Sequence, residues 1–300
     1  MLLTINPTKI YSQQESIQKY AKTFSANTPP KTQEKEKNNL PAILLTVGAI
    51  TLGVLACHKL KKINTVVDKL DSKNLEEFQI QLKNIFSKDF SKKDTFNIIN
   101  RYKQLNEIKD NREFYNKLFE QLKKDFKVEN KNLTLELWDK PLPVDGGEMR
   151  GYTEALTRKI GVTALEDRIK TSKYLFHEFK HVKQNELMYK TDPQKLINIK
   201  VKELEDSNNA SWKEILKSTN GNIAKARKLV EEEVKNVYKE FWGHLEQVSK
   251  TSESYKQGLK YLENEGNRIP PGEHYYEQIL EKEAQFVENA AEKLLNLIFG

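Results

Sequence analysis

An uninterrupted helix-forming run near the middle of the chain constrains the fold more than any other feature. Neither proline nor glycine occurs between Leu165 and Lys190, and apolar side chains recur there at helical spacing. Within this run, His177, Glu178 and His181 form a His-Glu-x-x-His sequence. Because four residues make about one helical turn, the two imidazoles project from the same face. The sequence therefore predicts a helix that presents two histidines side by side.

Two imidazoles at this spacing can bind one zinc ion, with zinc–nitrogen distances of about 2.0–2.1 Å. Glu178 then lies beside the metal, where it can take a proton from a metal-bound water. The chain contains only five histidines, so an accidental match, which is the alternative, needs two of them to fall at this spacing. We therefore predict a metal site at His177 and His181.

At these residues the chain resembles the zincin metallopeptidases. The metzincin branch would need glycine and histidine where this chain has Gln184 and Leu187, so that branch is excluded. The segment 281–284 reads Glu-Lys-Glu-Ala and resembles the ligand helix of gluzincin-like bacterial metallopeptidases. The resemblance implies that a glutamate from a later helix completes the zinc site.

The third ligand is predicted to be Glu283. A catalytic zinc has three protein ligands and one water, so one ligand is still needed. Glu283 falls within the apolar stripe of the last helix, whereas Glu281 falls on its polar side. A core-facing carboxylate is costly unless it is paired or metal-bound, and a salt bridge to Lys or Arg is the alternative role. Other candidates for the third ligand are Glu203, Glu232, Glu240, His244 and His274.

Charge and cysteine content narrow the function classes. The net charge is +7, but 50 basic residues are interleaved with 43 acidic ones, as on solvated helix faces. We therefore expect no nucleic-acid partner. The single cysteine, Cys57, excludes an internal disulfide framework.

The N-terminal part predicts a tail and a membrane anchor. Residues 1–39 are polar and rich in lysine, which is typical of a disordered tail. Residues 40–58 begin with an uncharged run of about eighteen residues followed by lysines, which predicts a single-pass transmembrane helix; a buried core helix is the alternative. The lysines on the two sides favour a cytoplasmic C-terminal part by a small margin.

The remainder predicts an α+β fold that is mostly α. Residues 59–130 show helical periodicity and could form a stalk or a packed cap. Residues 131–300 would form the zincin-like domain, in which a small antiparallel sheet precedes the motif helix and residues 192–268 form a helical insertion. By the resemblance, Lys159–Ala164 would be the edge strand that pairs with a peptide substrate, although an ordinary sheet edge fits equally. Thr163–Glu166 has the pattern of a capping box for the motif helix.

These observations lead to the hypothesis of a membrane-anchored zinc endopeptidase in which Glu178 is the general base. The partners would be a peptide or protein substrate and, through residues 40–58, the membrane. Four residues could stabilise the oxyanion: Tyr152, His274, Tyr275 and Tyr276. The main alternative is a non-catalytic membrane-anchored helical scaffold with a structural or degenerate metal site. A further alternative is a regulatory protease that cleaves one partner protein.

Overall fold

The computed structural model describes residues 72–129, 132–144, 147–154, 159–206, 210–268 and 274–299. The predicted tail at 1–39 and the predicted anchor at 40–58 lie outside the described residues. Among the helices that the structure does describe, none combines the length and the apolar character needed to cross a bilayer. The fold is mostly helical, with a small three-stranded sheet, in agreement with the mostly α class expected from the sequence.

Three helices follow one another in the first described segment, which belongs to the predicted region 59–130. Two of them begin at capping side chains: Ser91 accepts a hydrogen bond from a backbone N–H of α4, and Asp110 does so for α5. Their apolar faces share one core with the motif helix and the last helix, so they are packed against the rest of the protein rather than extended as a stalk. These helices are α3 (Ser72–Phe86), α4 (Lys92–Asn106) and α5 (Asn111–Asp125).

The main sheet has the strand order β1 (Thr134–Trp138), β5 (Lys159–Thr163) and β4 (Gly151–Glu154). β1 and β5 are parallel and β4 and β5 are antiparallel, so the sheet is mixed and the expectation of an antiparallel sheet is corrected. A separate hairpin of β2 (Leu142–Val144) and β3 (Gly147–Met149) lies between β1 and β4 in the chain.

The predicted edge strand, Lys159–Ala164, is not at an edge. It contains β5, which is the central strand, and both of its sides are occupied by β1 and β4. Residues 160–163 are all buried, as a strand with neighbours on both sides and a helix on one face requires. The terminal strands of this sheet are β1 and β4.

The motif helix is α6 (Arg168–Thr191), and it begins later than the capping-box pattern predicted. Thr163 ends β5 instead, and the carboxylate of Asp167 caps α6 by accepting backbone N–H groups from two residues of its first turn. The helix ends at Thr191, close to the predicted end. Asp192 then caps the next helix, whose first residue is a proline, by accepting the N–H of Lys195 at 2.9 Å.

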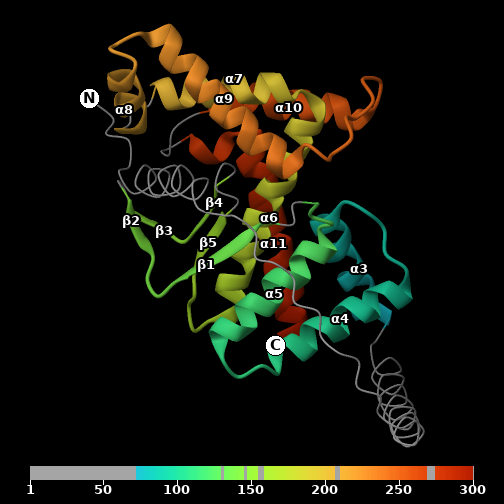
Figure 1. Cartoon of the computed structure of the whole chain (residues 1–300). Coiled ribbons are helices and arrows are strands. Elements are labelled where there is room, and N and C mark those ends of the chain that lie inside the picture. The colour runs from blue at the N-terminus through green and yellow to red at the C-terminus, as the bar shows by residue number, and fades with distance from the viewer. Residues whose placement is uncertain are drawn as a thin grey trace, which may run out of the picture.

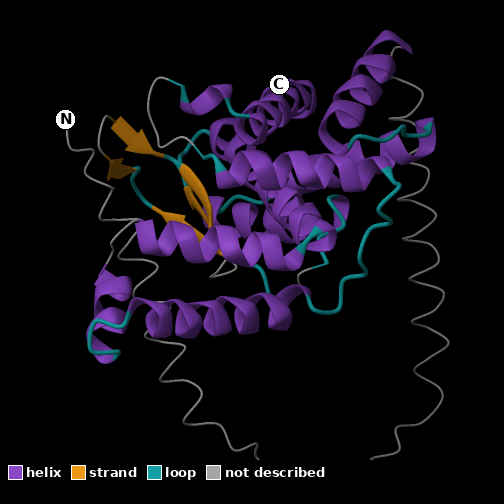
Figure 2. Ribbon diagram, turned by 90° about the horizontal axis from the view of Figure 1, so that it is seen from above, coloured by secondary structure: helices purple, strands orange, loops and turns teal. Residues whose placement is uncertain are grey.

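Four helices correspond to the predicted insertion at 192–268 and build a second apolar core. Two long helices, α6 and α11 (Ile279–Phe299), contribute to both cores. Phe176 of α6 and Val287 of α11 lie in the first core, and Met188 of α6 and Leu280 of α11 lie in the second. Figure 1 shows α6 and α11 side by side between α3–α5 and the insertion, and Figure 2 shows the strands at one side of the helices. The insertion helices are α7 (Pro193–Asp206), α8 (Ala210–Ser218), α9 (Ile223–Trp242) and α10 (Glu253–Gly266).

Candidate metal centre

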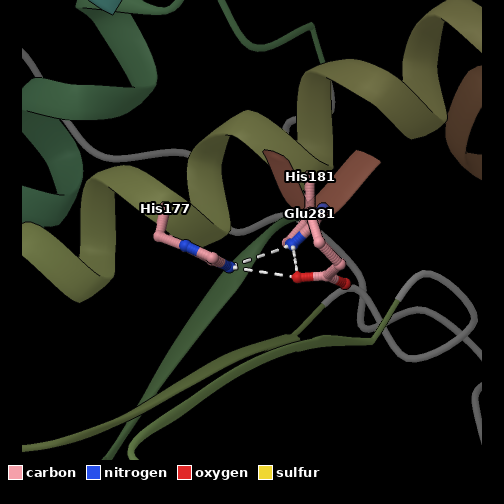
Figure 3. A group of neighbouring side chains, drawn as sticks. All are labelled: His177, His181 and Glu281. Atoms are coloured by element: carbon pink, nitrogen blue, oxygen red, sulfur yellow. Dashed lines mark hydrogen bonds and ion pairs between the residues drawn. The ribbon is translucent and has the colours of Figure 1, made fainter. Parts of the chain in front are cut away.

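Three side chains meet where α6 and α11 pass each other. His177 and His181 project from one face of α6, as predicted, and Glu281 reaches them from the first turn of α11 (Figure 3). The Nε2 atoms of the two imidazoles are 3.1 Å apart. Oε2 of Glu281 is 3.6 Å from Nε2 of His177 and 3.5 Å from Nε2 of His181. These residues are the one group in the described part of the chain whose ligand atoms could jointly hold a metal ion.

The spacing of these atoms fits a tetrahedral zinc site. Zinc bonds of about 2.0–2.2 Å to nitrogen and oxygen place any two ligand atoms of a tetrahedron about 3.3–3.5 Å apart. The three measured separations, 3.1, 3.5 and 3.6 Å, lie around that value. Two imidazoles and one carboxylate also form the ligand set of a catalytic zinc site, which leaves a fourth position open. The residues therefore fit the metal that the motif implies.

Glu281 is held from its other side by two residues. The hydroxyl of Tyr275, in the 3-10 turn η1 (Tyr275–Glu277), donates to Oε1 of Glu281. Nη2 of Arg268 lies 3.3 Å from that hydroxyl and 3.9 Å from the same Oε1. Oε1 is therefore directed toward the insertion while Oε2 faces the imidazoles. This division of the two oxygens fixes the orientation of the carboxylate.

The two histidines also have partners for their other ring nitrogens. Nδ1 of His181 lies 2.8 Å from Oε1 of Gln184, whose amide nitrogen donates to the carbonyl oxygen of Leu280 at 3.1 Å. Nδ1 of His177 lies 3.0 Å from Oε2 of Glu288, although the N–H direction is too oblique for a well-formed hydrogen bond. Partners of this kind set the tautomer and the ring orientation of metal-binding histidines.

The charges around His177 favour its protonated form when no metal is bound. Burial favours the neutral imidazole, but Glu281, Glu288 and Glu178 outweigh burial and raise the pKa of His177 to about 10. Burial likewise opposes ionisation of Glu281, but hydrogen bonds from the histidines and from Tyr275 hold its pKa well below its usual range. Burial raises the pKa of Tyr275, which therefore keeps its proton at neutral pH.

Glu178 is buried, and its carboxylate lies between α6 and the strand β4. Oε2 accepts a hydrogen bond from the hydroxyl of Thr153 at 2.7 Å, and the same hydroxyl lies 3.0 Å from the backbone carbonyl oxygen of Glu178. A Cβ atom on Gly151 would lie only 2.8 Å from Oε1. Thr153 therefore fixes one carboxylate oxygen, and the absence of a side chain at Gly151 makes room for the other.

The structure does not bring Glu283 to the histidines, and Glu281 takes the place predicted for it. Glu283 lies on another side of α11, where its carboxylate pairs with Lys180 at 2.9 Å and accepts hydrogen bonds from Gln257 and Tyr261. The alternative role stated for Glu283, a salt bridge to a lysine, is the one found. Glu281 is accordingly the candidate third ligand.

The phase of the apolar stripe on α11 explains this correction. The apolar residues Tyr276, Ile279 and Phe286 contribute to the hydrophobic pattern around Glu283, but they are 61%, 41% and 54% exposed. The buried face instead includes Ala284 and Ala291, whose small side chains carry little hydrophobic signal. Glu281 and Glu288 are seven residues apart and share that face, and this spacing is the signal that could have identified both.

The other predicted candidates lie away from the three ligand atoms. Glu203 pairs with Lys200, and the exposed His274 pairs with Glu277, while Glu232, Glu240 and His244 are exposed and do not belong to the group. Of the oxyanion candidates, the hydroxyl of Tyr152 donates to Glu136 and Tyr276 is largely exposed. Tyr275 is the candidate that contacts the group. Thr153, Gln184, Arg268 and Glu288 contribute to the site and were not predicted from the sequence.

No protein-family model, curated protein or solved structure matches this chain.

Proposed function

We propose that the chain is a zinc-dependent peptidase in which His177, His181 and Glu281 bind the metal and Glu178 is the general base. The observation that carries the proposal is the triangle of ligand atoms, whose edges of 3.1, 3.5 and 3.6 Å suit one tetrahedral zinc ion. A bound zinc would polarise the scissile carbonyl and lower the pKa of its water.

Glu178 lies on the same helix as the two histidines, and we assign the proton transfer to its carboxylate. It follows His177 directly in the chain, and its charge acts on that imidazole. In the proposed reaction the Glu178 carboxylate accepts a proton from the attacking water and then donates it to the leaving amine. The hydrogen bond from Thr153 holds one carboxylate oxygen and leaves the other to make this transfer.

The position of the sheet favours an extended peptide as the substrate. β4 is a terminal strand of the sheet and packs against α6 beside Glu178, through Gly151 and Thr153. An extended peptide can bind to a protein by lying alongside such a strand. A peptide aligned with β4 would bring its backbone carbonyl groups past the general base, which suits an endopeptidase.

The substitution Glu178→Gln tests the proposal, because it keeps the shape of the side chain and removes its ability to accept a proton. We expect the purified full-length variant to contain as much zinc as the wild-type chain and to lose cleavage of peptides in a mixed peptide library. The matched control is Glu283→Gln, on α11, whose carboxylate pairs with Lys180 instead. Full cleavage activity in the Glu178 variant would reject the mechanism.

A non-catalytic helical scaffold remains the second candidate, because the group can also be stable without a metal. A protonated His177 would be neutralised by Glu281 and Glu288, which lie 3.6 and 3.0 Å from its two ring nitrogens. This candidate predicts a folded metal-free chain and no chelator-sensitive cleavage of any peptide. Zinc analysis together with the library assay distinguishes it from the peptidase.

A further inference from the structure

A series of charged and hydrogen-bonded contacts joins the helical insertion to Glu281. Lys200 of α7 pairs with Glu265 of α10, and both side chains are nearly inaccessible to solvent. The guanidinium of Arg268, just after α10, lies 3.7 Å from that Glu265 carboxylate through Nη1. Through Nη2 it reaches the hydroxyl of Tyr275 and Oε1 of Glu281. The contacts therefore run from the insertion core to the candidate ligand without interruption.

The direction of the hydrogen bonds in this series is determined by the chemistry of the groups. A guanidinium can only donate, so the Tyr275 oxygen accepts from Arg268. A tyrosine hydroxyl has one proton, which is therefore available for Oε1 of Glu281. Because this acceptor is ionised, the bond is of the stronger, charge-assisted kind. Tyr275 thus fixes Oε1, and Oε2 is left to face the two imidazoles.

Tyr275 is itself fixed by its own turn. Its carbonyl oxygen accepts the side-chain amide of Gln278 at 3.0 Å and the backbone N–H of the same residue at 3.4 Å. The turn η1 is followed at once by α11, so the hydroxyl of Tyr275 reaches a carboxylate only six residues further along the chain. Arg268 fixes the position of the hydroxyl from the insertion side.

We propose that Arg268 and Tyr275 are positioning residues for the third metal ligand, and that the helical insertion serves to hold Glu281 toward His177 and His181. This inference rests on the proposed metal site but not on the peptidase reaction. It gives the insertion a structural role in metal binding. Removal of hydrogen-bond partners of metal ligands typically weakens metal binding about 10–100-fold.

Tyr275→Phe and Tyr276→Phe form a matched pair for the test. Each removes one hydroxyl from adjacent residues of η1, but Tyr276 is 61% exposed and the hydroxyl that reaches Glu281 belongs to Tyr275. Zinc affinity of the full chain is measured by competition with a chelator. We expect about 10–100-fold weaker zinc binding for Tyr275→Phe and wild-type affinity for Tyr276→Phe.

A second pair tests the guanidinium. Arg268→Gln removes the charge next to Glu281, whereas Arg227→Gln removes an arginine of the same insertion that pairs with Glu205. We expect weaker zinc binding only for Arg268→Gln, with partial recovery in Arg268→Lys, which restores the charge but not the two-sided contact. The visible absorption spectrum of Co²⁺ bound in place of zinc should change in Arg268→Gln, because a rotated Glu281 alters the ligand geometry. A loss of folding stability alone would leave this spectrum unchanged.

The outcomes separate this inference from the proposed function. Zinc affinities within twofold of wild type in both Tyr275→Phe and Arg268→Gln would overturn the positioning role and leave the peptidase proposal intact. If both variants bind zinc more weakly and the wild-type chain cleaves no peptide, the positioning role is supported and the peptidase is rejected. A wild-type chain that binds no zinc would overturn both.

Discussion

A single methyl group added at Gly151 should slow catalysis without unfolding the protein. In Gly151→Ala, the new Cβ would lie 2.8 Å from Oε1 of Glu178. Ordinary contact begins at 3.4 Å, so the carboxylate must retreat by about 0.6 Å. The atom that must move is the end of a flexible side chain, and Gly151 does not have the positive φ angle that would exclude alanine.

The displacement sets the expected magnitude. A misplacement of about 1 Å in a reacting group costs about 100-fold in rate, so 0.6 Å corresponds to roughly a tenfold loss of kcat, or about 1.4 kcal/mol of transition-state stabilisation. The stability change is expected to be small. Alanine reduces the freedom of the unfolded chain and gains about 0.4–1 kcal/mol, which offsets a weaker Thr153–Glu178 hydrogen bond of about 1 kcal/mol.

Three measurements on the same sample test the reasoning. They are kcat on a peptide that the wild-type chain cleaves, the zinc content, and the free energy of unfolding in urea. Gly266→Ala is the control, because a Cβ there would lie 3.6 Å from Ile199, at an ordinary contact distance. We expect a lower kcat only for Gly151→Ala, with zinc content unchanged and stability within about 1 kcal/mol of wild type.

Two results would refute the argument. An unchanged kcat would show that the reaction does not depend on the position of the Glu178 carboxylate beside β4. If Gly151→Ala loses zinc as well as activity, Gly151 supports the metal site and not the general base.

Three further predictions concern the ligands and pH. Glu281→Gln should weaken zinc binding more than 100-fold, which exceeds the usual effect of changing a hydrogen-bond partner of a ligand. In the same chelator competition, Glu283→Gln should bind zinc as the wild type does. Equal zinc affinities of the two variants would show that Glu281 is not the third ligand. Zinc binding near pH 7 should release about one proton, because His177, whose pKa is raised to about 10, must lose its proton to bind the metal. Calorimetry in buffers of different ionisation enthalpy measures the number of protons released. Binding without proton release would contradict this prediction. Burial opposes ionisation of Glu265, but Lys200 and Arg268 hold its pKa at about 2. The ionised carboxylate therefore contributes stability above about pH 4.3, and this contribution is lost as the pH falls toward 2. The difference in unfolding free energy between wild type and Glu265→Gln should therefore shrink over that range in urea titrations, and a constant difference would contradict the assignment.

Local patterns in the sequence predicted the elements that depend on local chemistry. The motif helix and the side-by-side histidines follow from spacing and from the absence of helix breakers, and both are found in α6. The start of α7 likewise depends on local residues, because Asp192 caps that helix directly before a proline. These features depend on residues within a few positions of one another, which a single sequence displays directly.

The features that were missed depend on long-range packing. The central position of β5 depends on which strand returns beside it, and nothing within Lys159–Thr163 specifies its neighbours. The choice of Glu281 over Glu283 depends on the rotation of α11 about its axis. The buried face of α11 includes Ala284 and Ala291, while the larger Ile279 and Phe286 are exposed. Hydrophobicity alone therefore did not show that Glu281, rather than Glu283, lies on the buried face.

The passage of α6 and α11 through both cores has a mechanical consequence. A continuous helix of 24 residues, about 36 Å long, is stiff, and α11 lies alongside it where the metal ligands meet. A hinge motion that separates the two cores would have to break backbone hydrogen bonds in both helices, at neighbouring positions along their axes. The distance between the two cores should therefore be constant, and small-angle X-ray scattering should give the same radius of gyration with and without zinc.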